Sequence, residues 1–443
     1  MSAKAELIAE AQKILKQNDR GFYTVPSETL YPHQWLWDSC FIAIGMRNYD
    51  VERAKIEILS LLRGQWHNGM LPHMIMTPGK KEHPYLGVWQ SWVNPNAPDE
   101  FSTSGITQPP MLAEAITRIG EKLPVVERRS WYRQVYPNLL AYHQWMYAER
   151  DPHNEGLILL IHPWETGLDN TPPWMAEMHE HLLPWWIRFL QKSRLDTILG
   201  LFRTDTRHVD RHQRPTNVEA MALYDAQRRL RRKEYNIDRI LDHSLFAIED
   251  LAFNSILIRA NKQLLEIAHT IRAEVPDDLI ANMKLTAKAF DELWDPYTES
   301  YYPRDFASHR LLKEPSVAGL LPLYAGCISK ERAAMLVKSL ENDHMFGPAY
   351  PIPSAPLHSL WFNPLRYWQG PTWFNTNWLI IEGLKRYGYD DHAAALAESM
   401  IELTRDHGFH EYYNPLSGAG LGAPNFSWTA ALTIDLLAKD TQK

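Results

Sequence analysis

The sequence is poor in cysteine and contains no long apolar run. Only two cysteines, Cys40 and Cys327, occur among 443 residues. Because each lies in apolar sequence, neither a disulfide framework nor a cysteine-based metal site is expected. No run of about 18 uncharged apolar residues suggests a membrane span, and residues 1–18 lack the apolar core of a signal peptide. These absences predict a soluble protein of the reducing cytoplasm that has no membrane contact.

An excess of positive charge is also absent. The chain carries 46 Lys and Arg against 53 Asp and Glu, a net charge of −7, with both signs mixed along its length. A nucleic-acid partner is therefore not expected. The one basic cluster, residues 228–233, stands on helical sequence and is typical of a solvated helix face. The histidines at 179–181 and 208–212 lack the zinc-binding spacing, so we expect no metal and no other cofactor.

Tryptophan and tyrosine, by contrast, are abundant, with 17 and 20 residues. A tryptophan is costly to bury unless its N–H finds a partner, and its flat face is a surface on which the apolar face of a sugar ring can stack. Composition alone favours core packing for most of these rings.

Helical periodicity covers most of the chain. Apolar residues recur at helical spacing from Val51 to Leu62, and again in a long segment that begins near Ser244. Strands of alternating pattern are scarce, and no linker or short repeat is present. We therefore expect one helical domain over residues 1–443. Further helices are expected near residues 1–18, 34–48, 108–121, 124–149, 216–234, 278–292, 330–342, 371–387, 390–406 and 425–438.

Long loops rich in aromatic residues, proline or glycine separate these helices. They cover residues 31–37, 68–98, 160–174, 347–369 and 409–424. Because ordered loops of this length tend to carry function, we expect the functional residues on the face that these loops form.

The first loop joins aromatic rings to a carboxylate. Its sequence from Tyr31 to Asp38 is Tyr-Pro-His-Gln-Trp-Leu-Trp-Asp. Asp38 stands just before an apolar helical segment, so it either caps that helix or accepts hydrogen bonds from sugar hydroxyls. The sequence leaves both interpretations open.

A second loop places two acids between tryptophans. Glu165 and Asp169 are four residues apart, and Trp164 and Trp174 flank them. Apolar surroundings could raise the pKa of one carboxyl toward the neutral range that a general acid needs. The alternative is that Asp169 is a turn or cap residue ahead of Pro172.

Two later loops supply further aromatic residues and a third acid. Tyr367, Trp368 and Trp373 form either a packed cluster or the walls of a ring-binding site, and Gly370 permits a tight turn between them. Glu411 lies among aromatics before a Gly-rich turn, where a solvated structural glutamate has little reason to be. Together the loops offer widely separated carboxylates with aromatic walls, which glycosidic bond cleavage uses.

Five motifs in these loops resemble those of glycoside hydrolase family 63. They occur in the order of that family and span nearly the whole chain, and the compact length is similar to that of the bacterial mannosylglycerate and glucosylglycerate hydrolases. The motifs are Trp35 to Asp38, Thr107 to Pro110, Glu165 to Asn170, Tyr367 to Pro371, and Glu411 to Pro415 with Phe426 to Ala430.

The resemblance implies an all-α fold, an (α/α)6 toroid, and an inverting mechanism. It implies Asp169 as general acid and Glu411 as general base. Tyr31, Trp164 and Arg214 would face the leaving group, and Gln369 and Gly370 would also contact substrate. The residues that would frame the sugar at the non-reducing end are Trp37, Asp38, Gln108, Tyr367, Trp368 and Trp373.

The resemblance further implies a small α-glycoside as substrate, either α-glucosylglycerate or α-mannosylglycerate. A glycerate carboxylate needs a cation, and Arg214 can bind it through two parallel hydrogen bonds, unless it is only a surface arginine. The chain departs from the family in having Thr171-Pro-Pro-Trp174 where Ser-Pro-Arg-Trp is common. It also has Ala220 where the glycerate hydrolases tend to carry tyrosine, with Tyr224 the nearest alternative.

Three other functions remain open at this point. An α-glucosidase for a neutral disaccharide such as kojibiose or trehalose would use the same acids without a charged leaving group. A non-catalytic sugar-binding toroid would keep the aromatic residues without needing both acids. A phosphorylase would need a phosphate pocket, and no Gly-rich, cationic loop of that type stands beside Glu411. The sequence also allows a homo-oligomer.

Overall fold

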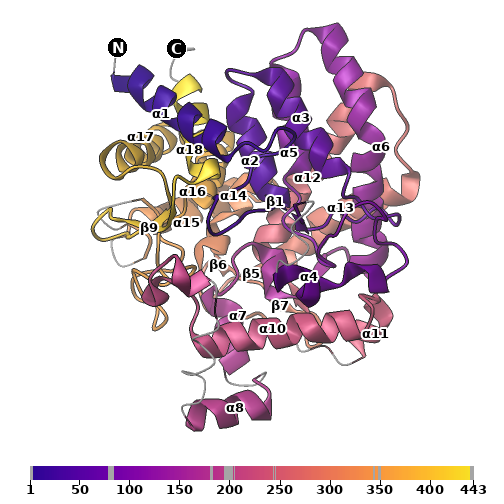
Figure 1. The fold of residues 1–443 in the computed structure, drawn as a ribbon, viewed down its shortest axis with the longest axis vertical. Helices are drawn as coiled ribbons and strands as arrows, with labels where there is room; N and C mark the ends of the chain where they lie inside the picture. The colour runs from indigo at the N-terminus through magenta and orange to yellow at the C-terminus, as the bar shows by residue number, and fades with distance from the viewer. Residues whose placement is uncertain are drawn as a thin grey trace.

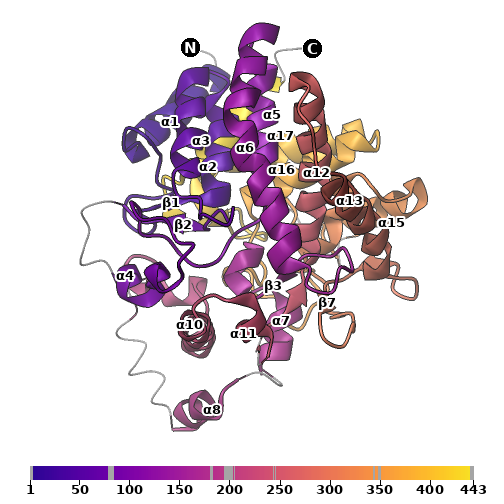
Figure 2. The same cartoon turned by 90° about the vertical axis from the view of Figure 1, so that its right-hand side faces the viewer.

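The computed structural model describes residues 3–77, 84–179, 183–193, 203, 205–242, 244, 246–342, 345–347 and 351–439. In this part of the chain, six helices form a closed ring in which each contacts the next and the last returns to the first (Figures 1 and 2). In order around the ring these are α2 (Leu36–Met46), α5 (Leu112–Glu121), α12 (Leu251–Ile271), α14 (Pro322–Ala325), α16 (Phe374–Arg386) and α18 (Ser427–Lys439).

A second layer of helices packs on the outside of the ring. Each outer helix contacts one or two inner ones, as α3 does with α2 and α5, and α17 with α16 and α18. This arrangement is the predicted (α/α)6 toroid. The outer helices are α1 (Ala3–Asn18), α3 (Val51–Leu62), α6 (Val125–Arg150), α13 (Asp277–Ala289), α15 (Lys330–Leu340) and α17 (Asp390–His407).

Burial distinguishes the two layers. Every residue of α2 is buried, and so are the residues of α16 from Phe374 to Leu384. Outer helices such as α17 bury only one stripe, which includes Ala393, Met400 and Leu403. Amphipathic periodicity is therefore visible in the outer layer, whereas the inner helix α2 is apolar on most sides.

One predicted helix boundary is wrong. The helix predicted to begin near Ser244 begins at Leu251, because Asp250 caps it with a hydrogen bond from the backbone N–H of Phe253, at 2.7 Å. The residues just before it, Ile248 and Glu249, pair with neighbouring strands instead. The other predicted helices exist, with ends shifted by a few residues.

Short elements fill the connections between the long helices. The connections contain one longer helix, α10 (Asn217–Arg232). They also contain the short helices α4 (Pro84–Trp89), α7 (Pro172–Glu177), α8 (Trp185–Lys192) and α11 (Ile237–Leu241). The antiparallel strands are β1 (Gln34–Trp35) with β2 (Met74–Ile75), β3 (Leu159–Leu160) with β4 (Ile248–Glu249) and β7 (Arg304–Asp305), β5 (Trp294–Asp295) with β6 (Ser300–Tyr301), and β8 (His410–Tyr413) with β9 (Gly420–Pro424).

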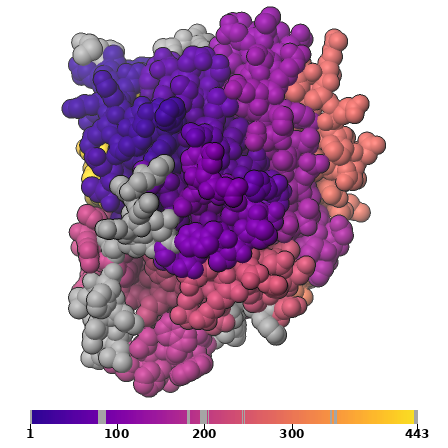
Figure 3. All heavy atoms as spheres, turned by 45° about the vertical axis from the view of Figure 1, so that its right-hand side comes forward, coloured from indigo at the N-terminus to yellow at the C-terminus, as the bar shows by residue number. Residues whose placement is uncertain are grey.

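The connections tie distant segments together on one side of the ring. Figure 3 shows the α10 region as a band below the loop that precedes α5. Side chains of α10 bond to the backbone of α4 there, since Gln227 donates to the Val88 carbonyl at 2.7 Å and Arg231 to the Gly87 carbonyl at 2.6 Å. Both cysteines are unpaired, and no helix of the described residues has the length and apolar character that crossing a membrane requires.

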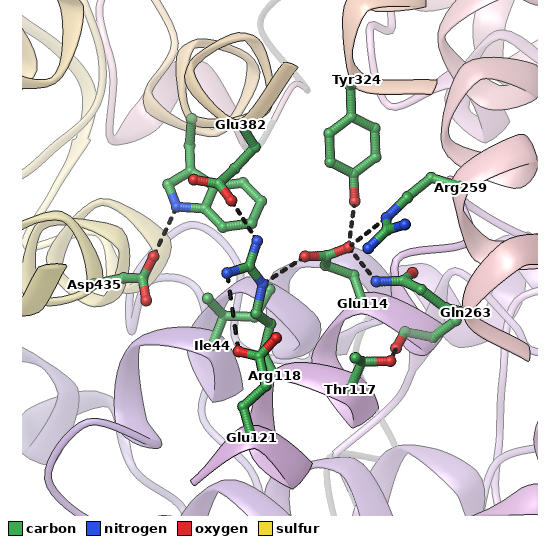
Figure 4. Close-up of polar contacts among 12 residues, drawn as sticks. Ile44, Glu114, Thr117, Arg118, Glu121, Arg259, Gln263, Tyr324, Glu382 and Asp435 are labelled. Atoms are coloured by element: carbon green, nitrogen blue, oxygen red, sulfur yellow. Dashed lines mark hydrogen bonds and ion pairs between the residues drawn. The ribbon is translucent and has the colours of Figure 1, made fainter. Parts of the chain in front are cut away.

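Inside the ring, a network of buried charges joins α5, α12, α14 and α16 (Figure 4). At its centre is Glu114, which is 1% exposed and accepts hydrogen bonds from Arg118 Nε at 2.6 Å, Tyr324 at 2.9 Å and Gln263. Burial would raise the pKa of Glu114, but the Arg118 and Arg259 guanidinium groups more than offset this and lower it. The carboxylate is therefore charged and satisfied.

Glu114→Ala is expected to lower the free energy of unfolding by about 3 kcal/mol, because the largely buried Arg118 and Arg259 each lose one carboxylate partner. Urea denaturation measures this loss. The matched control is Glu52→Ala, which removes an exposed partner of Lys55 and should cost less than about 1 kcal/mol. Equal, small effects of the two variants would show that the network does not stabilise the ring.

Candidate active site

A pocket of about 1050 Å³, measured to its open mouth, lies where several inner helices begin. Residues at the start of α2, just before α5, at the start of α16 and at the start of α18 all line it. The partial positive charges of these helix ends favour negative groups there. Of the predicted site residues, those lining the pocket are Tyr31, Trp37, Asp38, Gln108, Trp164, Asp169, Arg214, Tyr367, Trp368, Trp373 and Glu411.

Gln369 and Gly370 are not among the lining residues. The Gln369 side chain is fully buried and donates to the Asn170 carbonyl at 3.0 Å. A Cβ at Gly370 would overlap the backbone of Asn363. Both residues therefore shape the loop that carries Tyr367 rather than the pocket surface itself.

Stacked aromatic rings form one wall of the pocket. Trp368 and Trp373 are parallel with ring centroids 3.7 Å apart, and Tyr412 stacks on Trp373 at 4.5 Å. Trp37 lies beside Trp368 and packs against Gly167, whose φ of +71° and missing Cβ permit this close approach. The rings are thus both a packed cluster and a wall, so the two sequence interpretations are compatible.

Asp169 lies in a turn at the pocket, just before α7. It is not the helix cap, because Thr171 holds that position. Trp174 donates its indole N–H to the Asp169 carbonyl oxygen at 3.2 Å. Burial raises the pKa of the Asp169 carboxyl to about 7, although Arg214 and a hydrogen bond from Tyr367 act in the opposite direction. Asp169 can therefore hold a proton near neutral pH.

Glu411 lies on β8 and receives several hydrogen bonds. Tyr31 donates to Oε1 at 2.8 Å, Arg214 to the same oxygen at 3.3 Å, and the Ala423 backbone N–H to Oε2 at 3.0 Å. Burial raises the pKa of Glu411 above its ordinary value, although these three donors act in the opposite direction. The neighbouring Gly422 has no Cβ to collide with Oε2. The donors favour the ionised form of Glu411, whereas Asp169 has fewer of them.

Two tyrosine hydroxyls stand between the carboxyls of Asp169 and Glu411. Tyr367 hydrogen-bonds to Asp169, its hydroxyl lies 3.4 Å from that of Tyr31, and Tyr31 donates to Glu411. The carboxyls are therefore linked through hydroxyls. The negative charge of Glu411 also contributes to the raised pKa of Asp169.

Asp38 is another carboxyl that lines the pocket. Of the two interpretations left open by the sequence, the one in which Asp38 caps α2 is wrong, because the helix begins at Leu36 and Trp35 is the cap residue. Burial raises the pKa of Asp38 well above its ordinary value, and the charges of Glu411 and Asp169 add to this. A buried carboxyl that can bond sugar hydroxyls thus lines the pocket.

Arg214 is a buried cation in the pocket that contacts two carboxylates and an aromatic ring. Only 7% of the residue is exposed, so the interpretation as a surface arginine is wrong. Its guanidinium carbon lies 4.3 Å from the Tyr367 ring centroid, its Nη1 donates to Glu411, and its Nε lies 3.4 Å from Asp205 Oδ2. The cation is therefore adjacent to the Glu411 carboxylate.

Several lining residues were not assigned to the site from the sequence, although some of them lie within the five motifs. Arg203 and Asp205 lie in no recognisable motif. Ala220 and Tyr224, which the sequence marked as a departure from the glycerate hydrolases, line the pocket from successive turns of α10. The Tyr224 ring lies 5.5 Å from that of Trp164. The remaining unpredicted lining residues are Pro26, Trp35, His73, Met74, Trp89, Gly167, Pro215, Leu223, Phe426 and Trp428.

None of the described histidines in the clusters noted in the sequence lines the pocket. His179 is 3.6 Å from Glu219, and Glu180 and His181 fall outside the described residues. Within the ranges that the structure describes, no three His, Cys, Asp or Glu side chains are grouped to hold a metal ion.

Known proteins resemble the chain over nearly its full length. Residues 31–429 match the model of the mannosylglycerate hydrolase MGH1-like glycoside hydrolase domain. A mannosylglycerate hydrolase of Thermus thermophilus is 37% identical over 96% of this chain and 99% of its own. A glucosylglycerate hydrolase of Mycolicibacterium hassiacum is 31% identical over 98% of both chains.

The similarity extends to a solved structure. The crystal structure of a GH63 mannosylglycerate hydrolase from Thermus thermophilus in complex with Tris and D-glycerate has a TM-score of 0.86 to this chain at 36% identity. It covers 97% of this chain and 99% of that one.

Proposed function

Because the chain belongs to the mannosylglycerate hydrolase MGH1-like glycoside hydrolases of family 63, we propose that it hydrolyses an α-hexosyl glycerate to hexose and glycerate, with inversion. One observation carries this proposal: a single pocket holds a carboxyl with a raised pKa, a carboxylate with several donors, and a buried arginine beside them. The first two are the acid and the base of the reaction, and the third recognises the charged leaving group.

Asp169 is the general acid. Its pKa of about 7 keeps a proton on the carboxyl at neutral pH, and this proton passes to the glycosidic oxygen as the bond to the anomeric carbon breaks. The glycosidic oxygen then departs as a hydroxyl of glycerate rather than as an alkoxide. The Tyr367 hydroxyl holds the resulting carboxylate.

Glu411 is the general base. Tyr31, Arg214 and the Ala423 N–H orient both of its oxygens, and the ionised carboxylate takes a proton from the water that attacks the opposite face of the sugar. In an inverting hydrolase the two carboxyls stand about 6.5–9.5 Å apart to admit this water.

The sugar and the leaving group occupy different parts of the pocket. The stacked Trp368 and Trp373 rings and the buried Asp38 carboxyl suit a hexose, with its apolar faces and hydroxyl edge. Arg214 suits the glycerate carboxylate. Its bonds to Asp205 and Glu411 leave further donors among the five N–H groups of a guanidinium.

A panel of α-glycosides tests the substrate. The panel contains α-mannosylglycerate, α-glucosylglycerate, the matched α-hexosyl glycerol in which CH2OH replaces the carboxylate, kojibiose and trehalose. We expect kcat/KM on one of the glycerates to exceed that on its glycerol counterpart by at least about 10-fold, since a charge-assisted bidentate pair contributes about 1.5–3 kcal/mol. Faster turnover of a neutral disaccharide would favour an α-glucosidase function. Absence of turnover on every glycoside of the panel would favour a non-catalytic sugar-binding protein.

The pH dependence follows from the charges around the two acids. Activity needs Asp169 protonated and Glu411 ionised, so the alkaline limb of kcat/KM should fall as pH rises through about 7. Arg214 lowers the pKa of both carboxyls. Arg214→Gln should therefore move both limbs of the profile to higher pH. A profile of Arg214→Gln that keeps its limbs in place would contradict the assigned electrostatics.

The remaining predictions concern the protein as a whole. We propose that residues 1–443 act as one catalytic domain in the cytoplasm, supported by the packing of α1 on α18 and by two unpaired cysteines. That the protein forms a homo-oligomer remains a prediction, and light scattering can test it by measuring the molar mass in solution.

A further inference from the structure

The segment that carries Arg214 is held by an ion pair that belongs to none of the recognised motifs. Arg203 donates from Nε to Asp205 Oδ1 at 3.1 Å and from Nη2 to Asp205 Oδ2 at 2.6 Å. This bidentate arrangement is geometrically specific. Asp205 Oδ2 also lies 3.4 Å from Arg214 Nε. One carboxylate thus bridges two arginines at the pocket.

Arg203 also holds the backbone next to Arg214. Its Nη1 donates to the Pro215 carbonyl at 2.7 Å and to Asn217 Oδ1 at 3.2 Å. The pair therefore contacts the Arg214 segment twice, once at the side chain through Asp205 and once at the main chain through Arg203.

The bridge is partly shielded from water and carries its full charge. The side chains of Arg203 and Arg214 are 12% and 8% exposed, and that of Asp205 is 26% exposed. Burial alone would raise the pKa of Asp205, but the hydrogen bond from Arg203 and the Arg214 charge outweigh it and lower the pKa. Asp205 is therefore ionised wherever the enzyme works.

We propose that Asp205, held by Arg203, is a positioning residue that fixes the Arg214 guanidinium between Glu411 and the carboxylate of the leaving group. This inference rests on the proposed function. A free arginine side chain has about 2 kcal/mol of rotamer entropy. The Asp205 contact at Nε and the Tyr367 ring under the guanidinium together set its plane, so this entropy is lost before the substrate binds.

A second possible role of Asp205 predicts the opposite change in KM for the glycerate, so experiment can distinguish the two roles. If Asp205 acted only through its charge, it would repel an anionic leaving group, and removing the charge would lower KM for the glycerate. If it positions Arg214, removing it frees the guanidinium and raises KM.

Asp205→Asn tests the proposal on the glycerate and the matched glycerol glycoside. We expect kcat/KM on the α-hexosyl glycerate to fall by about 10-fold, mainly through KM, because a hydrogen bond to a charged group is lost. On the α-hexosyl glycerol, with each variant assayed at its own pH optimum so that a shifted Glu411 pKa does not count, the change should stay below about threefold. Asp205→Glu, which keeps the charge, should retain more of the preference. A lower or unchanged KM for the glycerate would overturn the proposal.

A double-mutant cycle with Arg214→Gln separates positioning from a structural effect on the loop. In the Arg214→Gln background, Asp205→Asn should cause no further loss on the glycerate, because the residue that it positions is already absent. Additive losses, or equal losses on both substrates, would mean that Asp205 merely stabilises the segment. Thermal melts of each variant establish that it is folded.

The pH dependence of kcat/KM tests the positioning role of Asp205 even if the proposed leaving group is wrong. If the wild-type enzyme does not prefer glycerate to glycerol, the proposed leaving group is wrong, whatever Asp205 does. In that case Asp205→Asn should still release Arg214 from Glu411 and so raise the pKa of the base. The acidic limb of kcat/KM on any substrate that is turned over should move to higher pH. A limb that stays in place or moves down would overturn the positioning role.

Discussion

Asp169→Asn is expected to lower kcat on an α-hexosyl glycerate by about 10³-fold, within the range of roughly 10²–10⁴ for general acid catalysis. The amide cannot protonate the glycosidic oxygen, so the glycerate must leave as an alkoxide. An α-hexosyl fluoride needs little protonation on departure. Its hydrolysis should therefore fall by less than about 10-fold, and steady-state assays on the two substrates measure the difference.

Folding of Asp169→Asn can be checked by its stability at different pH values. The pKa of Asp169 is raised to about 7 in the folded protein from about 3.9 in an unfolded chain. The resulting stability is complete below about pH 4 and is lost as pH rises through about 7. Because asparagine never ionises, the variant should be at least as stable as wild type at about pH 8.

Equal losses of activity on glycerate and fluoride would contradict the acid role.

Glu411→Gln is expected to lower kcat by about 10³-fold on both the glycerate and the fluoride. Both substrates need an activated water, and an amide cannot take its proton. Glu411→Ala opens space beside the anomeric carbon, so azide, which needs no deprotonation, should restore turnover of the α-hexosyl fluoride and give the β-hexosyl azide. NMR of the product identifies its configuration.

Two results would contradict the base role of Glu411. One is a Glu411→Gln variant whose hydrolysis of the fluoride is nearly unchanged. The other is azide rescue that gives an α-hexosyl azide, because azide would then have entered on the face from which the fluoride left. Asp38→Asn is a useful comparison, since Asp38 is a neighbouring buried carboxyl to which we assign binding rather than proton transfer.

The periodicity of apolar residues predicted the positions of the long helices in the chain, but not which helices pack against one another. Outer helices have one apolar stripe, and inner helices such as α2 are apolar on nearly all sides, so both types are visible in the sequence. Their closure into a ring depends on contacts between α2 and α18, which are far apart in the chain. The four-residue helix α14 was not predicted, because so short a segment has no periodicity to detect.

The candidate site was predictable where a motif carries the residue. Asp169 looked like a turn residue by its own chemistry, and only the order of the loop motifs indicated a catalytic role. Glu411 was distinguished by its aromatic neighbours and Gly-rich turn. Asp205 could not be found in this way, because its role depends on the spatial contact with Arg214. Gln369 shares a motif with Tyr367 but lies behind the pocket wall, which sequence order cannot distinguish.

The stereochemistry of the product tests the central claim most directly. Proton NMR can follow the hexose released from an α-hexosyl glycerate in the first minutes, before mutarotation mixes the anomers. Attack by a water that Glu411 activates, on the face opposite Asp169, predicts that β-hexose is released first. Initial release of α-hexose would mean retention, and would contradict the assignment of Asp169 and Glu411 as the acid and base of an inverting hydrolase.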